Sequence, residues 1–138
     1  FAGPDEGLGD QLRKKIKKES LENRIHLIGY IEGYDKVGAY TGAEFLVVPS
    51  RREAMSIVAL EAGACGTPVI LTTECGFDEV KEVGCKVVQP IADELYNGMN
   101  SMLSSSKSLK AMGNDLRNLI LERYTWKKSA EQYLKFLP

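Results

Sequence analysis

Two carboxylates placed eight positions apart, Glu53 and Glu61, are the strongest chemical signal in this chain. Glu61 is the single charged residue between Ser56 and Gly66. A carboxylate that leaves water is stabilised by a basic side chain or by a polar ligand, or it takes up a proton. Glu61 therefore predicts either a bound ligand with hydroxyl groups or a buried basic partner.

The segment around Glu61 predicts a helix with well-marked ends. Ser56 is a typical N-cap residue, Gly66 is typical of the position after a helix, and Pro68 cannot continue one. Apolar residues occupy nearly all the other positions, so we expect this helix to be buried almost all round.

The residues before this helix predict a corner between a strand and a helix. Residues 44–48 form a strand-like run that ends at Pro49. In parallel sheets, ligands bind beyond the carboxyl ends of the strands, where the free amides of the next helix attract anions. The amides of Ser56, Ile57 and Val58 suit a phosphate, whereas the two glutamates are acceptors suited to sugar hydroxyls. A phosphate beside hydroxyls describes a nucleotide sugar.

The run from Pro49 to Ile70, which contains Pro-Ser-Arg-Arg-Glu and Gly-Thr-Pro-Val-Ile, resembles a known signature. It is similar to the Glu-x7-Glu motif of the retaining glycosyltransferases called group 1, or family 4, of the GT-B fold. Residues 1–4 resemble the end of that family's second strand in the donor domain, residues 24–30 its next strand, and Thr125-Trp126 the start of its closing helix. The resemblance covers essentially the whole chain.

The resemblance implies a role for each matching residue. Glu61 would accept hydrogen bonds from the ribose of the donor, and Glu53 would face the donor sugar as the catalytic residue. The amides of Ser56 and Ile57 would hold the distal phosphate. The other residues expected to bind the donor are Ala54, Met55, Val58 and Gly76, together with Tyr30 and Ile31 near the base.

The chain departs from the family pattern at two places. Ala54 and Ser56 stand where the family often has glycines, and we expect ordinary backbone angles there. In the loop 73–79, Gly76 and Glu79 match the family, but Cys75 and Asp78 do not. This loop is expected either to contact the donor or to be a turn for which Gly76 supplies an unusual φ.

The order of patterns predicts an α/β fold with a Rossmann-like parallel sheet and helices on both faces, as in the C-terminal half of a GT-B fold. We expect strands near 24–28, 44–48, 69–72 and 85–89. We expect helices near 9–20, 34–42, 56–66, 77–83, 91–103, 108–123 and 126–137. Tyr124, Trp126 and Tyr133 are interpreted as helix-packing residues.

The length of 138 residues, with 43% apolar residues and a net charge of −1, predicts one domain over 1–138. The resemblance implies an N-terminally truncated piece, which lacks the preceding strand with its Arg and Lys and the N-terminal acceptor domain. We therefore expect the isolated chain to be inactive.

Composition argues against several other kinds of site. Three cysteines without CxxC spacing and a single histidine predict no zinc site and no disulfide framework. No cofactor and no metal are expected, and the substrate would be a UDP-, GDP- or ADP-sugar. The basic run 13–18 is read as a solvated helix face because acidic residues follow it, so nucleic acid is not an expected partner. We expect a cytoplasmic protein that contacts a membrane surface, if at all, through the whole protein.

The predicted function is transfer of a sugar to an acceptor hydroxyl with retention of configuration, in glycan, polysaccharide or glycolipid synthesis. A GT-B nucleotide-sugar epimerase or a non-catalytic nucleotide-binding domain remains an alternative. A receiver-like signalling domain is disfavoured, because no acidic cluster lies at the expected strand ends.

Overall fold

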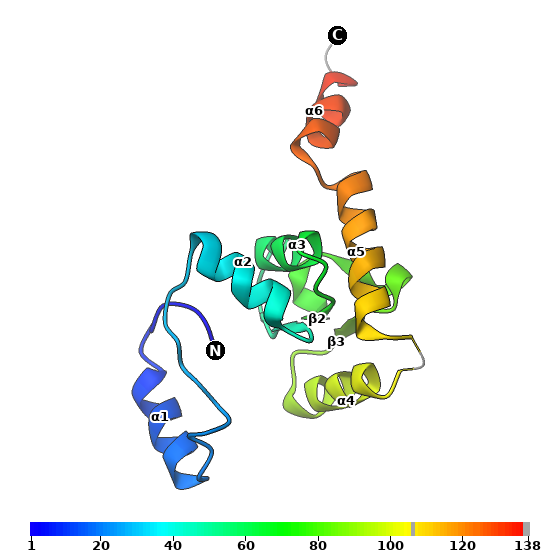
Figure 1. Cartoon of the computed structure of the whole chain (residues 1–138). Helices are drawn as coiled ribbons and strands as arrows, with labels where there is room; N and C mark the ends of the chain where they lie inside the picture. Colours follow the sequence, from blue (N-terminus) through cyan, green and yellow to red (C-terminus); the bar gives the residue numbers. More distant parts are fainter. Residues whose placement is uncertain (106, 137–138) are drawn as a thin grey trace. The chain divides into compact units, whose positions relative to one another are not determined.

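The computed structural model describes residues 1–105 and 107–136 of the chain (Figure 1). Contacts divide the chain into two compact units, Phe1–Lys36 and Val37–Pro138. The expectation of a single domain over 1–138 stays a prediction. The last residue of the helix expected at 126–137 lies outside the described residues.

The first unit contains the helix α1 (Gly9–Lys18) and a short parallel pairing between residues 1–3 and 26–29. The amide of Ile28 donates to the carbonyl of Phe1 at 3.0 Å, and the amide of Gly3 donates to the carbonyl of Gly29 at 2.8 Å. The strand expected at 24–28 is wrong, because only an isolated bridge forms between Ala2 and Gly29. The amides of residues 24 and 25 donate instead to the carbonyl of Leu21 in a turn, so the pairing cannot extend toward them.

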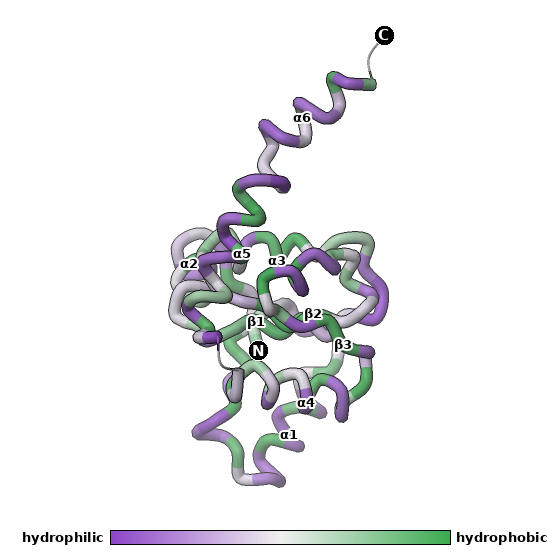
Figure 2. The backbone as a smooth tube through the Cα atoms, turned by 90° about the vertical axis from the view of Figure 1, so that its right-hand side faces the viewer, coloured by the Kyte–Doolittle hydropathy of each residue, from purple (hydrophilic) through white to green (hydrophobic). Residues whose placement is uncertain are grey.

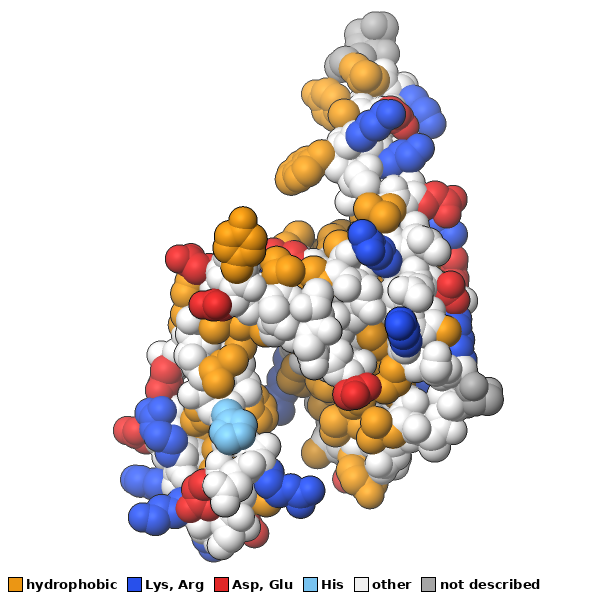
Figure 3. All heavy atoms as spheres, in the orientation of Figure 1, with side chains coloured by type: hydrophobic (Ala, Val, Ile, Leu, Met, Phe, Trp, Pro, Cys, Tyr) orange, Lys and Arg blue, Asp and Glu red, His pale blue; other side chains and the backbone are white. Residues whose placement is uncertain are grey.

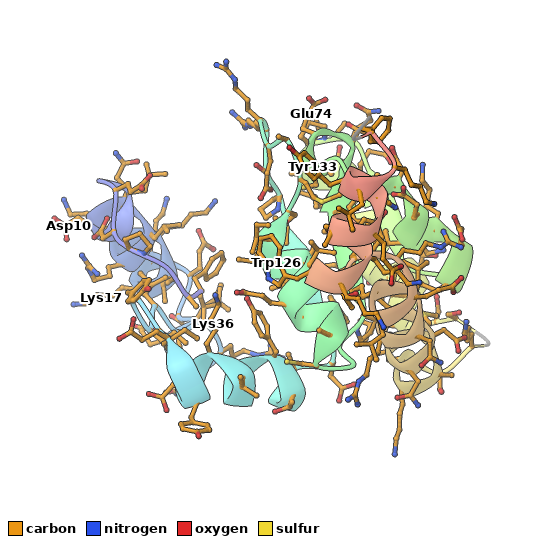
Figure 4. The ribbon with its side chains drawn as sticks, turned by 90° about the horizontal axis from the view of Figure 1, so that it is seen from above. Asp10, Lys17, Lys36, Glu74, Trp126 and Tyr133 are labelled. Carbon is orange, nitrogen blue, oxygen red and sulfur yellow. The ribbon has the colours of Figure 1, made fainter. Side chains whose placement is uncertain are left out.

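The basic run lies on α1 as a solvated face. Ile16 is buried, whereas the four lysines of the helix are exposed, and Lys17 projects outward (Figure 4). Arg13 forms ion pairs with Asp5 at 3.3 Å and with Asp10 at 2.9 Å. These exposed ion pairs contribute little to stability. The arrangement agrees with the solvated interpretation of this segment.

The second unit is built on a parallel sheet of three strands, β1 (Leu46–Val48), β2 (Val69–Thr72) and β3 (Lys86–Val88), in the order β1-β2-β3. Leu46 pairs with Val69, and Ile70 pairs with Lys86. All four residues of the central strand are buried. Three of the expected strands are therefore confirmed, and hydrophobic residues are concentrated in them (green in Figure 2).

Helices cover both faces of this sheet. Strand side chains alternate in direction, so Val69 and Leu71 pack with the helices α3 (Ile57–Ala64) and α5 (Leu109–Arg123). Ile70 points to the other face and packs against the helix α4 (Ala92–Leu103). The remaining elements of this unit are the helix α2 (Gly33–Gly42), which begins in the first unit, the 3₁₀ turns η1 (Thr73–Cys75) and η2 (Asp78–Val83), and the helix α6 (Trp126–Leu134). The predicted layered α/β fold is confirmed.

Several helix ends follow the expected capping chemistry. After α3, Gly66 has φ 82°, its amide donates to Gly63, and the amide of Thr67 donates to Ala62 at 3.0 Å. This pair of bonds is the Schellman motif, which satisfies carbonyls that the helix leaves unpaired. The Thr125 hydroxyl accepts from the amide of Lys128 at 3.3 Å and caps α6, as predicted.

The aromatic residues near the end of the chain do not share one role. Tyr124 packs edge-on against Phe77, with ring centroids 5.0 Å apart. Burial, and then a hydrogen bond to Glu79, raises the pKa of Tyr124 to about 12. Trp126 and Tyr133 on α6 are instead 92% and 67% exposed, so the packing expected for them is wrong (Figure 4). Hydrophobic side chains stand exposed along α6 in Figure 3. No residue of α6 is buried, and neither Trp126 nor Tyr133 belongs to the core cluster of the second unit.

Candidate functional site

The candidate site lies at the corner between β1 and α3, beyond the carboxyl end of the sheet. Main-chain bonds join this corner to the loop that follows β2. The amide of Glu53 donates to the carbonyl of Glu74 at 3.1 Å, and the amide of Ser56 donates to the carbonyl of Cys75 at 3.0 Å. These two bonds fix the backbone on both sides of Ala54 and Met55.

Buried side chains add further contacts between the end of β1 and the loop after β2. The Thr72 hydroxyl donates to the carbonyl of Ser50. The Cys75 thiol donates to the carbonyl of Val48 at 3.5 Å, and it lies 3.4 Å from the Thr72 hydroxyl oxygen. Thr72 and Cys75 are both buried, so the end of β1 and the loop after β2 are held together by main-chain carbonyls and short side chains.

Gly76 completes the junction because only glycine fits there. Its φ is 60°, in the left-handed region, and an added Cβ atom would lie 2.0 Å from the carbonyl oxygen of Ala54. The interpretation of Gly76 as a residue that supplies an unusual φ is confirmed. Its contact with a donor stays a prediction.

The first turn of α3 presents amides and apolar side chains to solvent. The first intrahelical bond runs from the amide of Leu60 to the carbonyl of Ser56 at 3.2 Å, so the amides of Ile57 and Val58 have no acceptor within the helix. The amide of Ser56 is not free as expected, because it donates to the carbonyl of Cys75, and its contact with a phosphate stays a prediction. Ile57 is 59% exposed and Val58 38%, so α3 is not buried all round as expected. The buried residues of the helix, Ala59, Ala62 and Gly63, all follow these two.

Ser56 occupies the N-cap position without capping. Its φ of −78° and ψ of 101° are ordinary, as expected, and so is the φ of Ala54, since Ser20 is the one non-glycine residue with positive φ in the described part of the chain. The side chain of Ser56 is fully buried, and its hydroxyl has no hydrogen-bond partner among the described residues. A buried hydroxyl without a partner lowers stability.

We expect Ser56→Ala to leave stability unchanged or to raise it by up to about 1 kcal/mol, because it removes a buried hydroxyl that makes no bond. The matched control is Ser108→Ala at the start of α5, where the hydroxyl accepts from the amide of Ala111 at 3.1 Å. That variant should lose about 1 kcal/mol with its cap. Urea and thermal denaturation compare the two. Equal losses would show that the Ser56 hydroxyl stabilises the fold after all.

Glu61 has a partner that the sequence did not reveal. The hydroxyl of Tyr40, on α2, donates to Oε2 of Glu61 at 2.9 Å. Burial, and then this hydrogen bond to Glu61, raises the pKa of Tyr40 well above its ordinary value. The Glu61 side chain is half-buried, so it lies at the surface of the unit rather than deep in the core. The sequence predicted a basic residue or a ligand as the partner of Glu61. The structure shows that the phenol of Tyr40 is also a partner.

The other predicted site residues lie in two places. Ala54 is exposed and Met55 is half-buried at the corner, next to Gly76. Tyr30, which is 70% exposed, and Ile31 belong to the first unit, and their contact with a base stays a prediction.

Within residues 1–105 and 107–136 there is no group of three or more His, Cys, Asp or Glu side chains that could hold a metal ion, and no helix has the length and apolar character needed to cross a membrane. A hollow of about 390 Å³ in the first unit is lined by Phe1, Asp5, Leu12 and neighbouring residues. It contains none of the predicted site residues.

Solved structures show which fold this is. The sucrose-phosphate synthase from Thermosynechococcus elongatus superposes with a TM-score of 0.82 at 26% identity, over 96% of this chain and 35% of that one. Anabaena HepE, in complex with UDP and glucose, gives a TM-score of 0.79 at 21% identity, over 97% of this chain and 38% of that one. The fold is that of the C-terminal half of the GT-B glycosyltransferases.

Sequence comparison gives the family. Residues 1–119 match the sequence profile of Glycosyl transferases group 1, and the chain belongs to this family. An uncharacterised glycosyltransferase of Methanocaldococcus jannaschii is 29% identical over 126 residues, which are 89% of this chain and 32% of the relative. The chain thus spans about a third of the length of this relative. The resemblance found in the sequence is confirmed.

Proposed function

We propose that this chain is the donor-nucleotide domain of a retaining glycosyltransferase. In the proposed reaction the bond between the sugar and the diphosphate breaks, the nucleoside diphosphate leaves, and an acceptor hydroxyl attacks with retention of configuration. Membership of the family supports the transferase activity. The complex of the structural neighbour HepE with UDP and glucose supports a nucleotide sugar as the donor.

The observation that carries the proposal is the arrangement along α3. The amides of Ile57 and Val58 lack acceptors within the helix, and Glu61 lies four residues further along, about 6 Å along the axis. Helix N-termini attract phosphate, and a carboxylate accepts bonds from hydroxyl groups. One short helix thus offers both kinds of contact that a nucleoside diphosphate needs. In the proposed complex Glu53, on the preceding corner, faces the sugar.

The experiment that tests this function measures donor binding and transfer by the whole protein. UDP, GDP, ADP and their sugars are compared by thermal shift, because a ligand that binds only the folded state stabilises it. We expect one base to be preferred, and a labelled sugar from that donor to appear in a polymer, glycan or lipid product. A labelled donor that is epimerised without transfer would favour the alternative activity. No thermal shift with any of these nucleotides at millimolar concentration would contradict the proposal.

A further inference from the structure

The bond between Tyr40 and Glu61 joins two helices that are far apart in sequence. Tyr40 lies near the end of α2 and Glu61 in the middle of α3, and 21 positions separate them. The hydroxyl of Tyr40 donates to one oxygen of the carboxylate, Oε2, at 2.9 Å. Hydrogen bonds to a charged acceptor are stronger than those between neutral groups. The bond therefore restricts the rotation of the Glu61 side chain.

Tyr40 is itself held in place through its main chain. The hydroxyl of Thr67 donates to the carbonyl of Tyr40 at 2.6 Å. This carbonyl lies in the last turn of α2, and it also accepts from the amide of Ala43 at 3.1 Å. Thr67 is buried, and its amide takes part in the bonds that end α3. Thr67 thus connects the end of α3 with the end of α2. Tyr40, at that end of α2, bonds in turn to Glu61 on α3.

Tyr40 is suited to remain a donor at every working pH. Burial, and then the bond to Glu61, raises its pKa, so the phenol keeps its proton. A carboxylate has about four lone-pair positions, so accepting from one phenol does not prevent it from accepting bonds from a ligand. The phenol also adds no positive charge that would compete for a phosphate.

We propose that Tyr40 is a positioning residue for donor binding, which orients the carboxylate of Glu61 toward the ribose hydroxyls of the nucleotide. This inference rests on the proposed function. Orienting the carboxylate before the ligand arrives reduces the ordering cost of binding. Tyr40 acts through Glu61 and touches neither the sugar nor the phosphates.

The alternative is that this bond only stabilises the fold. Tyr124 supplies a matched comparison, since its side chain is also half-buried and its hydroxyl bonds to Glu79. Tyr124 follows α5 and Glu79 lies in η2, so this bond joins a different pair of elements from the bond between Tyr40 and Glu61. Both tyrosine-to-phenylalanine changes remove one hydroxyl that bonds to a carboxylate, so they should have similar effects on stability.

The experiment is a double-mutant cycle on the whole protein, with Tyr40→Phe, Glu61→Gln, the double variant and the control Tyr124→Phe. The probe is whichever of UDP, GDP and ADP binds the parent protein most tightly, and Kd is measured by calorimetry. We expect Tyr40→Phe to raise Kd about tenfold, and to raise it much less when Glu61 is already Gln, because contacting residues are coupled. KM for the nucleotide sugar should rise with Kd, while kcat changes little. Tyr124→Phe should lower the melting temperature and leave Kd unchanged.

Each other outcome has a definite meaning. If Tyr40→Phe lowers the melting temperature but binds the probe as the parent does, the positioning role is wrong and the proposed function stands. Additive effects of Tyr40→Phe and Glu61→Gln on Kd would also overturn the role, since Tyr40 would then not act through Glu61. If the parent protein binds none of the three nucleotides, the proposed function fails, and the inference fails with it.

Discussion

Glu53→Ala is expected to lower kcat with a nucleotide sugar about 100-fold to 1,000-fold, as removal of a group that stabilises the transition state does. The Kd for the bare nucleoside diphosphate should stay close to the parent value. Glu53 precedes α3, and its amide is fixed to the carbonyl of Glu74. The sugar carbon gains positive charge as the glycosidic bond breaks. A carboxylate at the corner would stabilise that charge without contacting the nucleotide.

Glu61→Ala should show the opposite pattern in binding. Loss of hydrogen bonds to a charged acceptor costs about 1.5–3 kcal/mol, so we expect Kd for the bare diphosphate to rise at least about tenfold. The control is Glu44→Ala, which removes an exposed carboxylate before β1, at the opposite end of the strand from the corner. Calorimetry with the diphosphate and product formation with the donor give both quantities. Identical profiles for the Glu53 and Glu61 variants would contradict the division of roles.

Gly76→Ala should cause the largest loss of stability among the changes considered for this protein. The left-handed φ of Gly76 strains any other residue, and the new Cβ atom would collide with the main chain of Ala54. The collision can be relieved only if the two loops separate, which breaks the bonds from Glu53 to Glu74 and from Ser56 to Cys75. Strain and lost bonds together give an expected cost of about 3 kcal/mol or more.

The matched control for this change is Gly38→Ala on α2. Gly38 lies in a helix and is exposed, its φ is not positive, and an added Cβ would have no neighbour within 4 Å. That variant should gain up to about 1 kcal/mol, since alanine favours helices. Denaturant unfolding measures the stability of both variants, and binding of the preferred nucleotide is followed in parallel. A Gly76→Ala variant as stable as the parent would show that the junction of the two loops contributes little.

The layered architecture could be predicted because its signals are local. Apolar runs predict β1 and β2, and a glycine and a proline mark the end of α3. Each of these signals lies within or next to the element that it predicts. The strand expected at 24–28 was wrong because a strand also needs a partner. The alternation of apolar and polar residues at 25–27 does not show whether another segment is long enough to pair with them.

The residues of the candidate site could be predicted from the sequence, but the hydrogen bonds that join them could not. The two glutamates and the corner are visible in the sequence because their spacing is fixed within one loop and one helix. The bond from Tyr40 to Glu61 spans 21 positions, and no periodicity links them. The hydrogen bond from the Ser56 amide to the carbonyl of Cys75 could not be predicted for the same reason. The exposure of Ile57 and Val58 depends on where the neighbouring elements end, which an apolar pattern does not encode.

The junction between the two loops at the carboxyl end of the sheet is made chiefly of main-chain atoms. Amides and carbonyls are the same in every residue, so this junction does not depend on which side chains stand at 53–55 or 74. Substitutions at 54, 55 and 74 can therefore change the chemistry of the corner's surface while the loops keep their shape. The shape itself depends on Gly76, where any other residue would meet the main chain of Ala54.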